Sequence, residues 1–154
     1  MKKMISLFLL LCFCNMNVFA ADADTQKQRT YIKKYVEYAR SYIQRNGLVN
    51  SVQAFNNSKR DATQKALYIF GFVCGTPKMD GFSLINPGIP SRIYADVSNE
   101  PVIQALIKAS LEHPDGVWVR YNWLNPVTKK VQHKESYMLY LPEVHLCIGS
   151  GFYS

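Results

Sequence analysis

The chain has 154 residues and a formal net charge of +7, with 48% hydrophobic and 19% charged residues. This length corresponds to one domain that is large enough to form its own core. The basic charge favours anionic surfaces or ligands, and a merely solubilising surface is the alternative explanation.

The first 20 residues have the pattern of a secretory signal peptide. Residues 1–3 are basic, residues 5–13 are apolar, and residues 18–20 end in the small side chain that signal cleavage requires. The apolar run is shorter than the roughly 20 residues of a membrane span. We therefore expect cleavage after Ala20, one domain over residues 21–154 with no membrane span, and a periplasmic or secreted location.

Signal cleavage would leave Cys74 and Cys147 as the cysteines of the mature chain. An oxidising compartment permits a disulfide between them. Each cysteine lies within or at the end of a predicted strand, so a bridge depends on how those strands pair. Two buried free thiols are the alternative.

Residues 24–46 have the periodicity of a long helix that is capped by Asp24 or Thr25 and ends before Gly47. Its apolar face and the adjacent tyrosine row consist of Ile32, Val36, Ala39, Ile43, Tyr31, Tyr35, Tyr38 and Tyr42. Tyrosines interleaved with basic residues could indicate nucleic-acid binding. The helical spacing and the predicted export favour a packing face instead, and we expect no nucleic-acid partner.

The middle of the chain predicts a second short helix after Asn50 or Ser51 and then a hairpin. The hairpin strands are residues 65–73, which are apolar on both alternations, and residues 82–85. Residues 86–96 contain prolines and a glycine, which predicts an irregular segment that crosses the sheet face. We call residues 86–96 the crossing segment.

A helix capped by Ser98 or Asn99 follows the crossing segment. The last third of the chain then predicts three antiparallel strands, over residues 117–124, 131–141 and 145–153. Two helices, a hairpin, a helix and a meander indicate an α+β fold with helices on one side of an antiparallel sheet.

The last third also carries a motif of aromatic residues, glycines and lysines. It reads Gly-x-Trp-x-x-Tyr-x-Trp-x-Asn-Pro-x-Thr-x-Lys from Gly116, then Lys134-x-x-Tyr137, then Gly-Ser-Gly-Phe-Tyr from Gly149. With Ala54-Phe-Asn and Asn86-Pro upstream, it resembles the single Cache sensor domain over roughly residues 30–153. The resemblance implies a PAS-like sheet of five antiparallel strands, a long N-terminal helix behind it, and a ligand pocket on the other face under the crossing segment.

Candidate ligand-binding residues lie in this motif. Strand alternation puts Tyr121 and Trp123 on one face, where a phenol and an indole N–H can donate hydrogen bonds beside an apolar floor. Lys134 adds a cation, Tyr137 a second hydroxyl, and Arg92 of the crossing segment another cation. This set suits a small carboxylate. Lys134 and Tyr137 are three residues apart, so both reach one pocket only if the strand has a bulge or starts after Lys134.

The sequence does not indicate an enzyme, a cofactor or a metal site. It has no Gly-x-Ser-x-Gly elbow and no glycine-rich phosphate loop, and its histidines and cysteines lack metal or redox spacings. We expect a sensor-type Cache domain that binds a small organic anion, a short carboxylate, without a transducing segment of its own after Ser154. The alternative is an accessory module of the same fold that binds a partner in the cell envelope and no small ligand.

Overall fold

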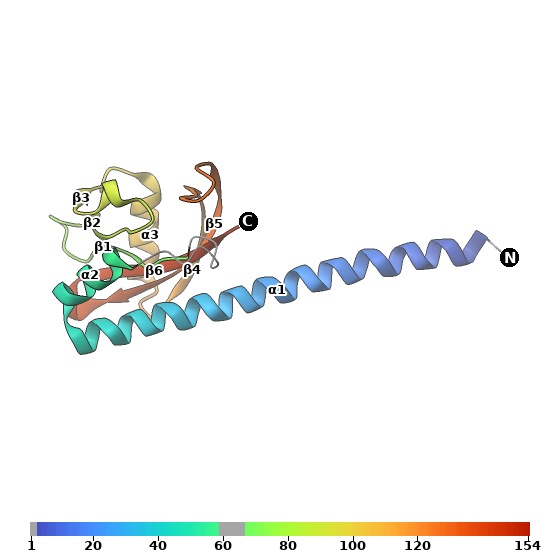
Figure 1. Ribbon diagram of the computed structural model, residues 1–154, viewed down its shortest axis with the longest axis horizontal. Coiled ribbons are helices and arrows are strands. Elements are labelled where there is room, and N and C mark those ends of the chain that lie inside the picture. Colours follow the sequence, from blue (N-terminus) through green and yellow to red (C-terminus); the bar gives the residue numbers. More distant parts are fainter. Residues whose placement is uncertain (1–2, 59–66) are drawn as a thin grey trace. The chain divides into compact units, whose positions relative to one another are not determined.

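The computed structural model describes residues 3–58 and 67–154, which form an α+β fold around one antiparallel sheet (Figure 1). The helices are α1 (Lys3–Asn46), α2 (Leu48–Asn57) and α3 (Pro101–Glu112), with 3-10 turns η2 (Pro90–Arg92) and η3 (Pro142–Val144). The strands are β1 (Phe70–Val73), β2 (Phe82–Ile85), β3 (Ala95–Asp96), β4 (Val117–Leu124), β5 (Val131–Leu141) and β6 (Leu146–Tyr153). Their order in the sheet is β3-β2-β1-β6-β5-β4. The predicted α+β class is confirmed, but the sheet has six strands where five were expected.

The additional strand is β3, which lies inside the crossing segment. Tyr94 N–H donates to Ser83 O at 2.7 Å and Val97 N–H donates to Gly81 O at 3.1 Å, so Ala95 and Asp96 pair with β2. A ladder of two residues is too short to show alternation in the sequence. The prolines of the crossing segment also predicted irregular structure, so this strand was not expected.

Residues 1–31 and residues 32–154 form two separate compact units, and α1 contributes to both. In the first unit α1 begins at Lys3, earlier than the predicted start at Asp24 or Thr25. The side chains of the predicted signal peptide lie outside the described residues, so that prediction stands untested. The first part of the predicted strand over residues 65–73 also lies outside them. Among the described residues, no helix combines the length and apolarity that crossing a membrane requires.

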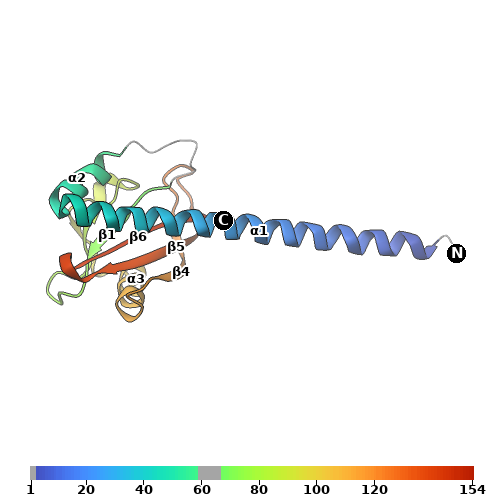
Figure 2. The same cartoon turned by 90° about the horizontal axis from the view of Figure 1, so that it is seen from below.

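In the second unit the sheet lies between two apolar layers. The part of α1 from Ile32 onward and α2 pack on one face, and α3 packs on the other with the crossing segment (Figure 1). Figure 2 shows the same end of α1 crossing in front of β5 and β6. The expectation that all helices lie on one side is therefore wrong. Strands β1 and β5 carry apolar residues on both alternations, so both faces of the sheet require cover.

The turn between α1 and α2 requires a glycine, as predicted. Gly47 has a φ of 75° and its N–H donates to Ile43 O at 2.9 Å, which closes the last turn of α1. Other residues rarely adopt this left-handed conformation. The turn lets α2 fold back against the sheet, where Val52 and Phe55 are buried.

Asn56 at the end of α2 ties that helix to the start of the crossing segment. Its Nδ2 donates to Leu84 O at 2.8 Å and its Oδ1 accepts from Asn86 N–H at 3.0 Å. One side chain thus satisfies the two backbone groups that flank Ile85 at the end of β2. This contact holds Asn86 at the edge of the face that α3 covers.

A disulfide joins the two central strands. Cys74, directly after β1, is bonded to Cys147 of β6, with the two Cα atoms 5.8 Å apart and both residues fully buried. The bond is possible because β1 and β6 are neighbours, with Phe72 opposite Cys147. Of the two alternatives that the sequence left open, the structure contains the bridge.

Substitution of Asn56 by alanine is expected to destabilise the fold by about 1–3 kcal/mol, because it removes two hydrogen bonds and leaves their backbone partners unsatisfied. Urea unfolding followed by circular dichroism measures the change. The exposed neighbour Asn57 provides the control, since Asn57→Ala should stay within about 0.5 kcal/mol of the wild type. Equal stability of the two variants would show that Asn56 does not hold this corner of the fold.

Candidate ligand-binding site

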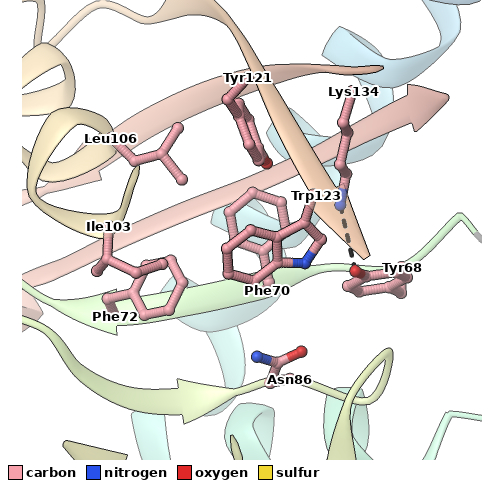
Figure 3. Close-up of a pocket in the computed structure, with 9 residues that line it drawn as sticks. All are labelled: Tyr68, Phe70, Phe72, Asn86, Ile103, Leu106, Tyr121, Trp123 and Lys134. Carbon is pink, nitrogen blue, oxygen red and sulfur yellow. Dashed lines mark hydrogen bonds between the residues drawn. The ribbon is translucent and has the colours of Figure 1, made fainter. Parts of the chain in front are cut away.

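A small enclosed cavity lies between the sheet and the layer formed by α3 and the crossing segment (Figure 3). Aromatic side chains of the strands, two aliphatic side chains of α3 and one amide surround a single cation. The lining residues are Tyr68, Phe70, Phe72, Asn86, Ile103, Leu106, Tyr121, Trp123 and Lys134. About 10 Å³ is open to the centre of a water molecule, which is room for roughly one water.

Lys134 is the charged group of this cavity and is only 2% exposed. Its Nζ donates to the Tyr68 hydroxyl at 3.2 Å. The ring centroids of Tyr68, Phe70 and Tyr153 lie 4.5, 4.8 and 5.1 Å from Nζ, so three aromatic faces surround the ammonium. In the part of the chain that the structure describes, no carboxylate forms an ion pair with it. The contacts described for this ammonium are therefore all with neutral groups.

Strand register explains why these side chains converge. Lys134 of β5 is directly opposite Tyr121 of β4 on one side and Tyr153 of β6 on the other. Opposite residues of an antiparallel sheet project to the same face. The predicted alternation of residues 117–124 therefore places Tyr121 and Trp123 on the cavity side, where their rings meet edge to face with centroids 6.0 Å apart.

The electrostatics of the cavity preserve the charge of Lys134. Burial disfavours the ammonium, but the phenol oxygens of Tyr121 and Tyr68 favour it, and the pKa of Lys134 lies above its ordinary value. Burial also raises the pKa of Tyr121, whose hydroxyl shares a 2.9 Å hydrogen bond with Ser136 Oγ. For Tyr68, burial acts in the same direction, but the adjacent Lys134 outweighs it and lowers the pKa of that phenol. The phenol oxygens and aromatic faces around Lys134 thus favour its charged form.

Arg92 lies beside the cavity but does not line it. Its Nη1 contacts both carboxylate oxygens of Glu100, at 2.6 and 2.7 Å. Its guanidinium carbon lies 5.2 Å from the ring centroid of Trp123. The structure places the predicted second cation outside the cavity lining, in an ion pair with Glu100. This pair joins the crossing segment to the start of α3, and Arg92 lies over the ring of Trp123.

Tyr137 lies on the opposite face of the sheet from Lys134. The register of β5 with β6 is continuous from Lys134 to Leu141, so three residues along the strand reverse the direction of the side chain. The Tyr137 hydroxyl donates to Asp115 O at 3.1 Å and its ring lies 5.4 Å from that of Trp118. The structure therefore does not bring Tyr137 to the cavity, since β5 has no bulge between Lys134 and Tyr137 and begins at Val131, before Lys134.

Several cavity residues were not predicted as site residues. The alternation of the first predicted strand did place Tyr68, Phe70 and Phe72 on one face. Nothing local indicated that this face meets Lys134, because the contact joins residues 66 positions apart. Ile103 and Leu106 of α3 close the cavity from the side opposite the sheet.

Metal binding has no support in the described residues, since none of their His, Cys, Asp and Glu side chains form a group of three or more that could hold an ion. The cavity offers one ammonium, phenol and indole donors and an amide, within aromatic and aliphatic walls. The chemistry of this lining suits a small anion with a short apolar part.

Comparison with known proteins identifies a family-level match. A family model described as a Cache domain matches residues 77–154. The model is of the dCache type, whereas the sequence motif resembles the single Cache type, and the Cache resemblance is confirmed. A search of curated protein sequences finds no match.

Three solved structures share the fold. A methyl-accepting chemotaxis protein from Vibrio parahaemolyticus has a TM-score of 0.65 at 18% identity, over 83% of this chain and 89% of that one. A Cache chemosensory domain described by its recognition of carboxylic acids has a TM-score of 0.61 at 14% identity, over 85% and 93%. A periplasmic sensor domain of a chemotaxis protein has a TM-score of 0.58 at 17% identity, over 82% and 92%. These likenesses confirm the predicted Cache-type, PAS-like fold.

Gly88 of the crossing segment should not tolerate a side chain. A Cβ at this position would lie 2.2 Å from Cζ of Tyr68, whose ring is buried. Gly88→Ala is expected to lower stability by about 1–3 kcal/mol through overpacking. Urea unfolding measures the effect, and a double-mutant cycle with Tyr68→Leu identifies its cause. A penalty that persists in the Tyr68→Leu background would mean that the ring is not what excludes the side chain.

Proposed function

This chain belongs to the Cache domain family, and from that premise we propose that it is an extracytoplasmic sensor-type domain that binds a small organic anion, a short carboxylate. One observation carries the proposal. The ammonium of Lys134 is buried in a cavity where it contacts aromatic faces and a phenol. A carboxylate is the ligand that such a cation would bind most favourably.

The contacts of Lys134 leave capacity for a ligand. An ammonium has three N–H donors, and the hydroxyl of Tyr68 accepts from one of them. Figure 3 shows the indole nitrogen of Trp123 on the same side of the cavity, directed toward the gap between Lys134 and Tyr68. A carboxylate at this point would meet a charge-assisted donor in a site that largely excludes water.

The walls of the cavity indicate a short ligand. Phe72, Ile103 and Leu106 form an apolar side that suits an aliphatic tail. Asn86 contributes an amide, and its Oδ1 already accepts from Ile89 N–H at 3.2 Å. The other atom of that amide is a donor that a hydroxyl or keto oxygen of the ligand could use.

The comparisons support this proposal at the level of chemistry and location. One structure of the same fold is that of a Cache chemosensory domain that recognises carboxylic acids, and another is a periplasmic sensor domain. A periplasmic domain would require export, which agrees with the signal peptide predicted for residues 1–20. At 14–17% identity these proteins support a ligand class and a location for this chain by analogy.

A second candidate function has an observation in its favour. The cavity has room for about one water, and Tyr68 already contacts the ammonium. A site that stays closed would make the domain an interaction module for a partner in the cell envelope, with the cavity serving only as core. The two candidates differ in whether a small acid binds.

A thermal-shift screen of the purified domain decides between them. The panel is acetate, propionate, butyrate, lactate and pyruvate, with acetamide and propionamide as uncharged controls of matched shape. A ligand at 100 times its Kd stabilises the native state by about 2.7 kcal/mol. Stabilisation by an acid but not by the amides is the expected result. If no acid of the panel stabilises the domain, the second candidate is favoured, an interaction module whose cavity stays closed.

Lys134→Met is expected to weaken binding of the best acid about 10- to 150-fold, because it removes a charge-assisted contact worth about 1.5–3 kcal/mol. The unliganded variant should be as stable as the wild type or more stable, since methionine fills the space without a buried charge. Isothermal titration at one pH and one salt concentration measures the affinity, and unfolding measures the stability.

Tyr137→Phe is the matched control for this experiment. Tyr137 is on the same strand but faces α1, where its ring lies 5.5 Å from Lys33 Nζ. Its substitution should leave the affinity for the acid unchanged. Equal affinity of the wild type and Lys134→Met would place the binding site elsewhere.

A further inference from the structure

We propose that Tyr68 is a built-in occupant of the anion site, whose hydroxyl takes the position of a ligand oxygen on Lys134 and must be displaced when an acid binds. This inference rests on the proposed function and adds that the Tyr68 hydroxyl competes with the acid for Lys134. It makes the affinity for the acid depend on a side chain that weakens binding.

The position of the hydroxyl is the first argument. Among the described residues, the Tyr68 oxygen is the acceptor that Lys134 Nζ contacts, at 3.2 Å, and the ring of the same residue lies 4.5 Å from Nζ. A neutral phenol is a weaker acceptor for an ammonium than a carboxylate is. The free protein therefore satisfies Lys134 with a partner that a ligand can replace.

The lack of space is the second argument. A cavity with room for about one water cannot admit even acetate unless one of its walls moves. Phe70 and Phe72 belong to β1, which pairs with strands on both sides, and Lys134 belongs to β5, which does the same. Tyr68 lies before the first residue of β1, outside the ladder. Among the aromatic walls beside the ammonium, Tyr68 is thus the one that strand pairing does not hold.

The anchoring of Tyr68 indicates how it would move. Its carbonyl oxygen accepts from Ser150 Oγ of β6 at 2.8 Å, which fixes the main chain. Displacement is therefore a rotation of the side chain rather than a movement of the segment. The ring already packs against the crossing segment at Gly88, so its rotation would change that contact. Entry of a ligand is in this way linked to the segment that Arg92 and Glu100 join to α3.

Competition and contact have opposite signatures. If the hydroxyl only contacts a bound acid, its removal weakens binding. If it competes with the acid for Lys134, its removal strengthens binding. The stability of the unliganded protein is a separate readout, since removing the acceptor of a buried ammonium lowers that stability.

The test compares Tyr68→Phe with Tyr153→Phe. Both rings lie against the ammonium, but the Tyr153 hydroxyl donates to Leu124 O at 3.1 Å, whereas the Tyr68 hydroxyl accepts from Lys134 Nζ. Isothermal titration uses the acid of the panel above that stabilises the wild type most, or propionate if none does. We expect Tyr68→Phe to lower the Kd about 10-fold or more and to lower the Tm of the free protein. Tyr153→Phe should leave the Kd within about twofold.

The outcomes separate the two proposals. If the wild type binds the acid and Tyr68→Phe binds it equally or more weakly, the inference is overturned and the proposed function stands. If Tyr68→Phe binds an acid that the wild type does not, the inference is supported, because the hydroxyl then masks the site, and the proposed function of the wild type is overturned. If neither protein binds any acid, both are overturned. Tyr68→Leu, which also removes the ring, repeats the comparison if Tyr68→Phe does not fold.

Discussion

The burial of one positive charge is the constraint around which this domain is arranged. An ammonium removed from water is strongly destabilising unless its surroundings favour positive charge. Around Lys134, three strands and Tyr68, which lies two residues before β1, supply aromatic faces and phenol oxygens that do so. The concentration of polar aromatic residues at this point of the sheet follows from that requirement, and so does the closure of the face by α3.

The two faces of the sheet consequently differ in character. On the side of α1, Tyr137 and Trp118 pack in an apolar layer with the aliphatic residues of the helix. On the side of α3, the same strands hold a charge and several hydroxyls in a space that purely apolar residues would fill more stably. Proteins retain such locally unfavourable arrangements chiefly where function depends on them. The asymmetry supports a binding role independently of any similarity to other proteins.

Local sequence patterns predicted the parts of this structure that depend on neighbours in the chain. Alternation placed Tyr121 and Trp123 on the correct face, and the glycine at position 47 marked the end of α1. The patterns did not predict features that depend on contacts between segments far apart in the sequence. The contact of Tyr68 with Lys134 requires the strand order β1-β6-β5, and the position of α3 requires knowing which face α1 already covers. Tyr137 was assigned to the site through a motif spacing that the regular pleat of β5 does not support.

The position of β6 has a consequence for how the chain folds. This strand is the last in sequence and yet lies in the centre of the sheet, where Phe70 pairs with Gly149. Until β6 is in place, β1 and β5 each expose an unpaired edge that can join strands of other chains. The long sequence separation of β1 and β6 also slows folding, because a large loop must close before their contacts form. A newly made chain is therefore most prone to aggregate before its final strand inserts, and the bond between Cys74 and Cys147 then locks that insertion.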